Sequence, residues 1–449
     1  MTDTLTSRED LRSFLARGAK PQQDWGVGLE VEKLIVDCNT GEAASYERIR
    51  ALLAHLEGTL GWEGLYDGEF LVGLTGKKSS VTLEPGGQLE LSGRLCRDIH
   101  CSQRDYDRYV GQIVTAGRPL GLCFLGLGAQ PFTGLGEIGW LPKRRYGVMG
   151  PYMSRTGDMG QRMMKQTAGI QVNLDFSDEA DCVRKVRLSQ LLTPVFYTLF
   201  ANSPILEDRP SGFLSVRGEI WSRTDPVRCG LIPQLLRVGA GFDDYIEYAL
   251  DVPLYFLQRD RQLIDMTERP LTFRQYLNDG YLDFRATLSD WDLHLSTLFP
   301  EVRLRPQIEI RTADSLPQHM ATSVAALAKG LLYDAEALDR VEGLFGGLSE
   351  QEFVTLYRRS WTSGLKTPFL GGQLSEAAAV LVDEARSSLR RQYAAGLSDS
   401  DESHFLDPLS GMLAGGESLA ERLLKQWSGS RLDKLALLFR HCGYGPPLS

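Results

Sequence analysis

The chain has 449 residues, of which 43% are hydrophobic and 24% charged, and its formal net charge is −9. This composition is typical of a globular protein with a large core, and an acidic chain without a Lys/Arg block argues against a nucleic-acid partner. The longest apolar run, 191–201, is too short and too polar to cross a bilayer, and residues 1–25 lack the apolar core of a secretory signal. We therefore expect a cytoplasmic protein with no membrane partner.

The cysteines and histidines show no metal-binding pattern. The seven cysteines are odd in number, scattered and without a CxxC pair, and the six histidines lack ligand spacing. A zinc site and a disulfide framework are both disfavoured. The expectation is that the cysteines are buried free thiols.

Helical and extended patterns alternate through the first two thirds of the chain. Apolar residues at helical spacing, such as Ile49, Leu52, Leu53 and Leu56, predict helices. Shorter segments in which apolar and polar residues alternate predict strands, and Pro-Gly-Gly at 85–87 interrupts one of them with a turn or bulge. The predicted helices span 46–60, 99–117 and 177–201, and the predicted strands span 28–34, 81–91, 169–176 and 306–311.

The last third has a different composition. From about Pro317 the chain is rich in Ala, Leu and Arg and has few strand patterns. We therefore expect an α+β protein with a body over 1–316 and a helical C-terminal portion over 317–449 packed on the same body. The helices predicted in this portion span 320–333, 351–361, 375–395 and 419–427.

The predicted strands carry their polar residues on one face. Side chains i and i+2 point the same way, so Glu30 and Glu32 lie opposite Leu29, Val31 and Lys33. For any single strand, a polar face that meets water is the more common arrangement. Four such faces in one large protein are harder to assign to the surface. They carry Glu30 and Glu32, then Glu84, Gln88 and Glu90, then Gln171 and Asn173, and finally Glu309 and Arg311.

Convergence of these faces would place five glutamates together. Such a cluster is unfavourable unless cations neutralise it. Oxygen ligands select hard cations, and a site that also holds a polyphosphate selects Mg²⁺ or Mn²⁺. The sequence has no Walker A motif, no dinucleotide fingerprint and no GxSxG elbow. It therefore predicts metal-assisted chemistry and gives no support to a covalent nucleophile.

The stretch LEPGGQLELSG at 83–93 is highly specific, and it resembles the plant-type glutamate–cysteine ligases, a family with many bacterial members. The resemblance extends over nearly the whole chain. It continues in segments that are individually less specific, at 28–33, 142–146, 171–176, 200–204, 212–217, 251–253, 299–303 and 308–311.

This resemblance implies a fold related to glutamine synthetase, in which a curved, mainly antiparallel sheet forms a funnel around ATP and metal ions, with surrounding helices. The implied reaction is the first step of glutathione synthesis. ATP phosphorylates the γ-carboxylate of L-glutamate, and the amine of L-cysteine then attacks the γ-glutamyl phosphate. The implied partners are these small molecules, with Mg²⁺ or Mn²⁺ as cofactor, and we expect a monomer or a homodimer.

The resemblance also implies roles for individual residues. It marks Arg217 and Arg311 as catalytic, because a guanidinium offers a two-pronged match to a carboxylate or phosphate. A solvated loop is an equal alternative for Lys143 and Arg145, and packing is an equal alternative for Trp221. The implied metal ligands are Glu30, Glu32, Glu84, Glu90 and Glu309, and the implied substrate or nucleotide contacts are Gln88, Lys143, Arg145, Gln171, Asn173, Trp221, Asp225 and Arg228.

Two alternative functions stay open. After the fourth strand the chain reads TADSLP at 312–317 and is then Ala-rich, whereas the plant-like pattern has more glycine and aromatic residues. If this loop helps to form the amine pocket, the acceptor could be another amino acid or amine in a specialised pathway. The second alternative is a catalytically silent homologue that binds an amino acid or nucleotide, and the presence of every acidic and arginine candidate argues against it.

Overall fold

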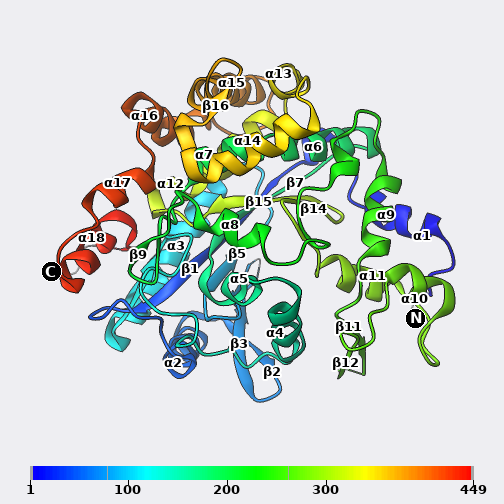
Figure 1. The fold of residues 1–449 in the computed structure, drawn as a ribbon, viewed down its shortest axis with the longest axis horizontal. Helices are drawn as coiled ribbons and strands as arrows, with labels where there is room; N and C mark the ends of the chain where they lie inside the picture. Colours follow the sequence, from blue (N-terminus) through cyan, green and yellow to red (C-terminus); the bar gives the residue numbers. More distant parts are fainter. Residues whose placement is uncertain (1–3, 78, 261, 446–449) are drawn as a thin grey trace.

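The structure is a computed structural model that describes residues 4–77, 79–260 and 262–445. Its centre is a sheet that has nine strands within these residues, in the order β14-β15-β7-β1-β5-β4-β3-β2, with β6 paired to β1 (Figure 1). All of these pairs are antiparallel. The strands are β1 (Val27–Asp37), β2 (Glu63–Asp67), β3 (Phe70–Thr75), β4 (Ser80–Leu83), β5 (Leu89–Ser92), β6 (Leu122–Leu125), β7 (Gly169–Leu174), β14 (Val302–Leu304) and β15 (Ile308–Asp314).

Strand β1 has different partners along its length. Its first half pairs with β7 on one side and β5 on the other, and from Leu34 onward it pairs with β6. Because side chains alternate, Glu30 and Glu32 point to one face of the sheet. Lys33 points to the other face, where it is fully buried with its Nζ 4.8 Å from the ring centre of Tyr109. The predicted separation of polar and apolar faces is therefore confirmed on this strand.

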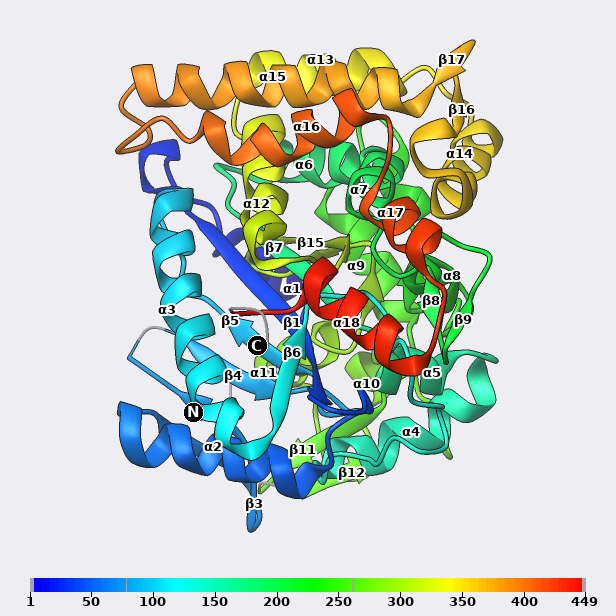
Figure 2. The same ribbon diagram turned by 90° about the vertical axis from the view of Figure 1, so that its left-hand side faces the viewer.

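Three helices cover the apolar face of the sheet: α2 (Tyr46–Leu60), α3 (Ile99–Gly117) and α12 (Gln318–Leu332). Helix α2 packs on β3, α3 packs on β1 and β6, and α12 packs on β1 and β7. Helix α12 is buried from Met320 to Leu332 because it lies between the sheet and α15 (Leu374–Ala394), which crosses the top of the molecule in Figure 2.

Shorter helices cover the polar face. Helices α4 (Arg144–Thr156), α5 (Gly160–Gln166) and α8 (Val216–Ser222) lie in front of the sheet in Figure 1. The other helices of the first two thirds are α1 (Arg8–Ala16), α6 (Glu179–Leu191), α7 (Thr193–Phe200), α9 (Phe242–Asp251), α10 (Phe273–Asp279) and α11 (Leu288–Leu295). Short two-stranded pairs join β8 (Ile205–Leu206) to β9 (Arg209–Pro210), β10 (Cys229–Gly230) to β13 (Phe299–Pro300), and β11 (Phe256–Arg259) to β12 (Gln262–Asp265).

The C-terminal portion is helical, as predicted, and the α+β class is confirmed. Its helices pack on α12 and on one another, and the hairpin of β16 (Pro368–Phe369) and β17 (Gly372–Gln373) precedes α15. No helix in the described part of the chain has the length and apolar character that crossing a bilayer requires. The helices that follow α12 are α13 (Ala335–Phe345), α14 (Glu350–Ser363), α15, α16 (Asp407–Gly415), α17 (Leu419–Gln426) and α18 (Arg431–Cys442).

One predicted helix is divided. The segment 177–201 forms α6 and α7, which meet at Leu192. Pro194 lies in the first turn of α7, where a missing N–H group is tolerated, and its ring prevents α6 from continuing. The apolar periodicity continues across this break and therefore did not reveal it.

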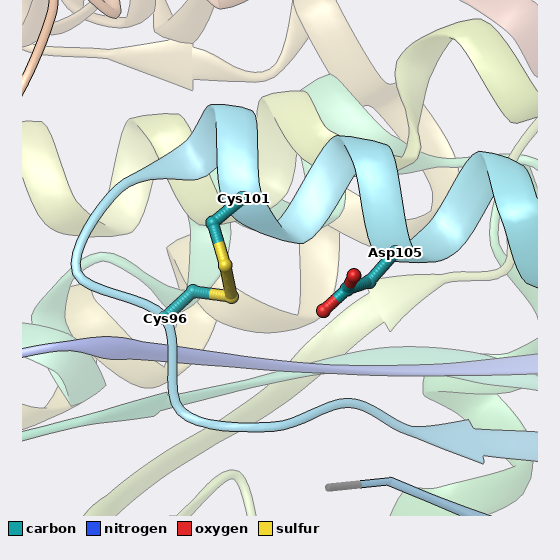
Figure 3. A group of neighbouring side chains, drawn as sticks. All are labelled: Cys96, Cys101 and Asp105. Carbon is teal, nitrogen blue, oxygen red and sulfur yellow. A yellow bond between two sulfur atoms is a disulfide. The ribbon is translucent and has the colours of Figure 1, made fainter.

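The expectation of free thiols is wrong for four cysteines. Disulfides join Cys38 to Cys123 and Cys96 to Cys101, and the second lies beside Asp105 of α3 (Figure 3). Cys38 follows β1 and Cys123 lies in β6, so the pairing of these strands brings the two together across 85 residues. Scattered spacing does not reveal such a contact, because the sheet register creates it. The free cysteines in the described chain are Cys182, Cys229 and Cys442.

Candidate active site

A cavity of about 310 Å³ lies between the polar face of the sheet and helices α4, α5 and α8. It contains most of the residues that the strand alternation selected, so the predicted convergence occurs. The charged and amide groups of its lining are Glu30, Glu32, Glu84, Gln88, Glu90, Lys143, Arg145, Gln171, Arg303 and Arg311. The apolar part of the lining includes Tyr146, Met149, Met163, Met164, Trp221 and Phe299.

Four glutamates form the acidic end of the cavity: Glu30, Glu32, Glu84 and Glu90. None of them makes a salt bridge to a basic side chain among the described residues. Burial and the charges of Glu90 and Glu84 raise the pKa of Glu32 to about 8, and burial and the charge of Glu30 raise the pKa of Glu90 to about 8. Burial and the charge of Glu309 raise the pKa of Glu30 to about 7. The cluster is therefore short of positive charge.

Neutral donors hold these carboxylates in place. Glu32 accepts hydrogen bonds from the backbone N–H of Gly169 at 2.5 Å and from Nε2 of Gln171 at 3.3 Å. The same amide lies 3.4 Å from Glu90, which also accepts from Ser92 at 2.9 Å. Gln171 therefore links β1 and β5 from the neighbouring strand β7 and leaves the remaining carboxylate lone pairs available to a ligand.

A tight turn between β4 and β5 places Glu84. The N–H of Gly87 donates to the carbonyl of Glu84 at 2.8 Å, and Gly87 has a φ of 85°, a left-handed conformation that glycine adopts without strain. Gln88 fixes the turn to α5, because its Nε2 donates to the carbonyls of Met164 and Thr167. Gln88 thus lines the cavity, but both amide protons of its side chain are used within the protein.

Two arginines, Arg303 and Arg311, also line the cavity. Arg303 donates from Nε and Nη2 to the two oxygens of Glu309, both at 2.8 Å, and Arg311 also donates to Glu309. Although burial would raise it, these two guanidinium groups hold the pKa of Glu309 at about 2. Glu309 is not part of the cavity lining, and neither is Asn173, whose amide donates to Glu30 at 2.9 Å.

Arg217 and Trp221 meet Arg311 at a second, very small cavity of about 10 Å³. Arg217 donates to the carbonyls of Thr312 and Arg311, while its Nε and the Nε1 of Trp221 are buried without a partner among the described residues. The guanidinium of Arg311 lies 5.7 Å from the ring of Trp221. The two predicted catalytic arginines therefore lie side by side.

Lys143 and Arg145 enter the main cavity from the start of α4. The ammonium of Lys143 donates to the carbonyl of Leu83 at 2.6 Å, and burial lowers the pKa of Lys143. The Nε of Arg145 is buried without a partner among the described residues. Neither side chain belongs to a solvated loop, because both line the cavity.

The structure places Asp225 and Arg228 outside the cavity. They form a fully buried ion pair at 3.0 Å, and the guanidinium of Arg228 lies 3.7 Å from the ring centre of Tyr255. Segment 312–317, where the sequence departs from the plant-like pattern, does not line the main cavity either. Its Asp314 is buried and accepts hydrogen bonds from Ser203 and Ser215.

Sequence reasoning did not select several residues that line the cavity. Arg303 lies on the short strand β14 directly opposite Glu309, and Met149, Met163 and Met164 come from α4 and α5. An arginine next to a predicted Glu–Arg strand was the available signal. The methionines gave none, because their role depends on how two helices pack over the sheet.

Residues 26–436 match glutamate–cysteine ligase family 2 (GCS2). The chloroplastic glutamate–cysteine ligase of Nicotiana tabacum is 38% identical over 426 residues, which cover 94% of this chain and 80% of the relative. The chain belongs to this family. Glutamate–cysteine ligase B of Oryza sativa subsp. japonica, also chloroplastic, is 37% identical over 94% of this chain and 84% of its own length.

These relatives correct the expected location. The glutamate–cysteine ligases of Brassica juncea and Arabidopsis thaliana, each 38% identical to this chain, are chloroplastic like those of tobacco and rice. By comparison with these relatives, the cytoplasmic prediction is wrong. That prediction used the composition of residues 1–25, which does not identify a compartment.

Solved structures share the fold of this glutamate–cysteine ligase family member. The glutamate–cysteine ligase of Francisella tularensis, solved in complex with AMP, has a TM-score of 0.55 and 12% identity, covering 93% of this chain and 88% of that one. A bifunctional glutathione synthetase from Pasteurella multocida has a TM-score of 0.51 and 12% identity, covering 98% of this chain and 53% of that one. At this identity the likeness concerns the fold alone.

The four glutamates fit a hard divalent cation. Their donors are carboxylate oxygens, which such cations prefer, and the raised pKa values of Glu30, Glu32 and Glu90 are consistent with a cluster that lacks a counter-charge. A second group of candidate ligands, Cys96, Cys101 and Asp105, does not fit a metal ion. Its sulfurs are joined in a disulfide (Figure 3), and Asp105 pairs with Arg94 at 2.6 Å.

Proposed function

We propose that this protein joins the γ-carboxylate of L-glutamate to the amine of L-cysteine at the expense of ATP. One observation carries the proposal: a single cavity is lined by four carboxylates without salt-bridge partners among the described residues and by Arg311, whose Nε and Nη2 are unused. A complex of a divalent cation with a polyphosphate matches this combination, because the cation neutralises the acids and the phosphoryl oxygens meet the guanidinium of Arg311. Family membership supplies the identity of the substrates.

Glu30, Glu32, Glu84 and Glu90 would hold Mg²⁺, which when bound neutralises phosphoryl charge. Glutamate's γ-carboxylate oxygen attacks the γ-phosphorus of ATP, the bond to the bridging oxygen breaks, and ADP leaves. The cysteine nitrogen then attacks the carbonyl carbon of the γ-glutamyl phosphate, which releases phosphate and a proton and forms the amide. Phosphoryl transfer of this kind needs positioning and charge stabilisation more than covalent participation by the protein.

The chain's own residues position the reactants and keep water out. Arg311 retains Nε and Nη2 without hydrogen-bond partners in the described chain, so both can bind phosphoryl or carboxylate oxygens. Next to Arg311, the Nε of Arg217 and the indole N–H of Trp221 are unpaired in the described chain, and Arg145 adds an unpaired Nε elsewhere in the cavity lining. Tyr146, Met149 and the other apolar side chains of the lining reduce the access of water to the reactive acyl phosphate.

The test is product formation by the purified protein with ATP, Mg²⁺, glutamate and a panel of amines, followed by mass spectrometry. We expect γ-glutamylcysteine, ADP and phosphate in equal amounts, with cysteine giving the highest kcat/KM of the amines tested. Turnover should be lost when EDTA removes divalent cations. A higher kcat/KM with another amine would refute cysteine as the acceptor. Absence of any ADP in the presence of every amine would refute ligase activity altogether.

A further inference from the structure

Among the three arginines that line the cavity, Arg303 has its donors most completely used within the protein. Its Nε and Nη2 bind the two oxygens of Glu309, and its Nη1 donates to the carbonyls of Ser296 at 3.2 Å and Leu298 at 3.1 Å. This leaves one of the five N–H donors of a guanidinium. The side chain of Arg303 is only 12% exposed, and its hydrogen bonds to Glu309 and to the two carbonyls fix its position. It is therefore poorly suited to bind a substrate directly.

Arg311 has the opposite arrangement. Only its Nη1 is engaged, by Glu309 and by the side-chain oxygen of Gln171, and no described residue bonds its Nε or Nη2. The guanidinium lies 5.7 Å from the ring centre of Trp221 and 5.9 Å from that of Phe299, and it lines the cavity. Arg311 therefore has free donors, and the surrounding rings restrict how it can turn.

The register of the sheet connects these two arginines through one carboxylate. Glu309 on β15 lies directly opposite Arg303 on β14, and Arg311 is two residues along β15 on the same face. Both oxygens of Glu309 are taken by the Arg303 fork, so Arg311 can bind only from the side with one nitrogen. Without the fork, Arg311 would be free to close on Glu309 as a two-pronged pair, which is the preferred geometry for guanidinium and carboxylate.

We infer that Arg303 is a positioning residue: by occupying both oxygens of Glu309, it keeps two N–H edges of Arg311 free for the phosphoryl oxygens of the nucleotide. The identity of this anion rests on the proposed function. Arg303 itself does not touch the nucleotide. Its effect on nucleotide binding passes through Arg311, and this dependence separates the inference from a simple packing role.

The test is a double-mutant cycle on the affinity for Mg²⁺ with a non-hydrolysable ATP analogue, AMP-PNP, measured by calorimetry. Arg303→Gln and Arg311→Gln are each expected to weaken binding about tenfold or more, the effect of losing a charge-assisted hydrogen bond. Because Arg303 acts through Arg311, the double variant should bind no more weakly than Arg311→Gln alone. A structural role for Arg303 would not produce this non-additivity.

Two further variants keep the result interpretable. Arg303→Lys retains the charge without the fork and is expected to weaken binding as well, and it replaces Arg303→Gln in the cycle should that variant fail to fold. Arg305→Gln is the matched control, because Arg305 follows the same strand, pairs with Asp292 and lies outside the cavity lining. It should bind as the parent does.

The outcomes distinguish this inference from the proposed function. A parent that binds the nucleotide while the effects of Arg303→Gln and Arg311→Gln multiply overturns the inference and leaves the proposed function intact. If Arg303→Gln binds the nucleotide as tightly as the parent does, the inference is likewise overturned and the proposed function stays intact. A parent that binds no nucleotide overturns both, because the free edges of Arg311 would then serve another anion.

Discussion

At the scale of single residues, the four glutamates of the cavity are distinguished by the lack of a salt bridge to any described basic side chain. Neutral donors fix Glu32 and Glu90, and no described basic side chain pairs with them, whereas Glu309 on β15 is bound by two arginines. The pKa values move in opposite directions accordingly, to about 8 for Glu32 and Glu90 and to about 2 for Glu309. Three glutamates on one sheet face therefore have two different electrostatic environments.

The raised pKa of Glu90 predicts how the stability of the metal-free protein changes with pH. A carboxyl group whose pKa is higher in the folded state binds its proton more tightly there. Its contribution to stability is complete below its unfolded pKa of 4.5 and is lost as pH rises toward about 8. Between pH 5 and pH 7 in EDTA, the parent should therefore lose more stability than Glu90→Gln, by on the order of 1–2 kcal/mol.

Urea unfolding of both proteins at the two pH values measures this difference. The low pKa values of His294 and His441, about 3 and 4, act in the opposite direction, but they contribute equally to parent and variant and cancel in the comparison. The range stops at pH 7 because burial lowers the pKa of Lys33 to about 7 and adds a rise in stability above it. Equal changes in parent and variant would mean that Glu90 is already ionised at pH 5.

Glu84 should matter for turnover and little for folding. Its side chain accepts no hydrogen bond from a described residue, so Glu84→Gln leaves no buried partner unsatisfied. If the carboxylate holds a divalent cation, the variant should lose on the order of 100-fold in kcat while its melting temperature stays close to that of the parent. Steady-state kinetics at saturating Mg²⁺ and a thermal melt measure the two quantities.

Glu69→Gln is the matched control for this experiment, because Glu69 is exposed in the turn between β2 and β3. Its kcat and melting temperature should both equal those of the parent. A parent-like kcat for Glu84→Gln would remove Glu84 from the set of metal ligands. A large fall in its melting temperature would instead assign the carboxylate to the fold.

At the scale of elements, the turn between β4 and β5 joins the acidic cluster to α5. A Cβ atom on Gly86 would lie 2.2 Å from the carbonyl oxygen of Lys165 and 2.7 Å from its Cα, and backbone atoms cannot rotate away. We expect Gly86→Ala to lower the free energy of unfolding by roughly 1–3 kcal/mol, the range for overpacking. It should also lower kcat, because Glu84 and Glu90 flank this turn.

The control for this substitution lies in α2. Gly58 has no atom within 4 Å of a built Cβ, so Gly58→Ala should be neutral or stabilise the protein by about 0.5–1 kcal/mol. Urea midpoints compare the two variants, and kcat follows the effect on the site. If Gly86→Ala unfolds like the parent and retains its kcat, the turn must be able to move away from α5.

Elements defined by local sequence pattern were predicted well, and features defined by long-range contacts were not. Helices 46–60 and 99–117 agree with α2 and α3 to the residue, because one apolar face and clear ends define them. Alternation placed Glu30, Glu32 and Glu90 on the cavity face because the strand period is fixed. The break at Pro194 has a local cause that the continuing apolar periodicity concealed. The Cys38–Cys123 disulfide and the burial of the Asp225–Arg228 pair depend on distant neighbours, and local pattern gave no sign of them.

The pairing of residues within the site also depends on contacts between segments that are far apart in the sequence. The predicted set contained the four glutamates and Arg311 of the cavity lining. It did not include Arg303, which decides how Glu309 and Arg311 share their hydrogen bonds. Its importance follows from the register of β14 against β15, which sequence periodicity does not fix across a hairpin. A motif can therefore name the charged residues of a site before it can say which of them pair with one another.

At the scale of the whole molecule, the cavity combines segments that are far apart in the sequence. The strand order β14-β15-β7-β1-β5-β4 brings glutamates from residues 30 to 90 and arginines from residues 303 to 311 into one cavity. Helix α12, from the C-terminal portion, packs on β1 and β7 behind this face. We propose that residues 1–316 and 317–449 unfold together as one unit.

The buried ion pair between Lys329 of α12 and Glu402 tests this proposal. The two groups lie 2.5 Å apart with side chains 3% and 0% exposed, and Glu402 also accepts from the N–H of Ile99, which begins α3. Lys329→Met leaves an uncompensated buried carboxylate and should destabilise the protein by about 3–5 kcal/mol. Lys329→Met with Glu402→Gln should cost less, because the amide keeps an acceptor for Ile99 without a charge.

If the two portions unfold as one unit, the stability lost in Lys329→Met must lower the unfolding temperature of the whole molecule in one transition. Tryptophan fluorescence and residual ligase activity should then fall at the same, lower temperature, since α12 supports β1, the strand that carries Glu30 and Glu32. Lys425→Met, which removes an ion pair to Glu417 from a lysine whose side chain is 73% exposed, should change stability by no more than about 1 kcal/mol. Two separate transitions, with activity surviving the first, would mean that the C-terminal helices unfold independently of the site.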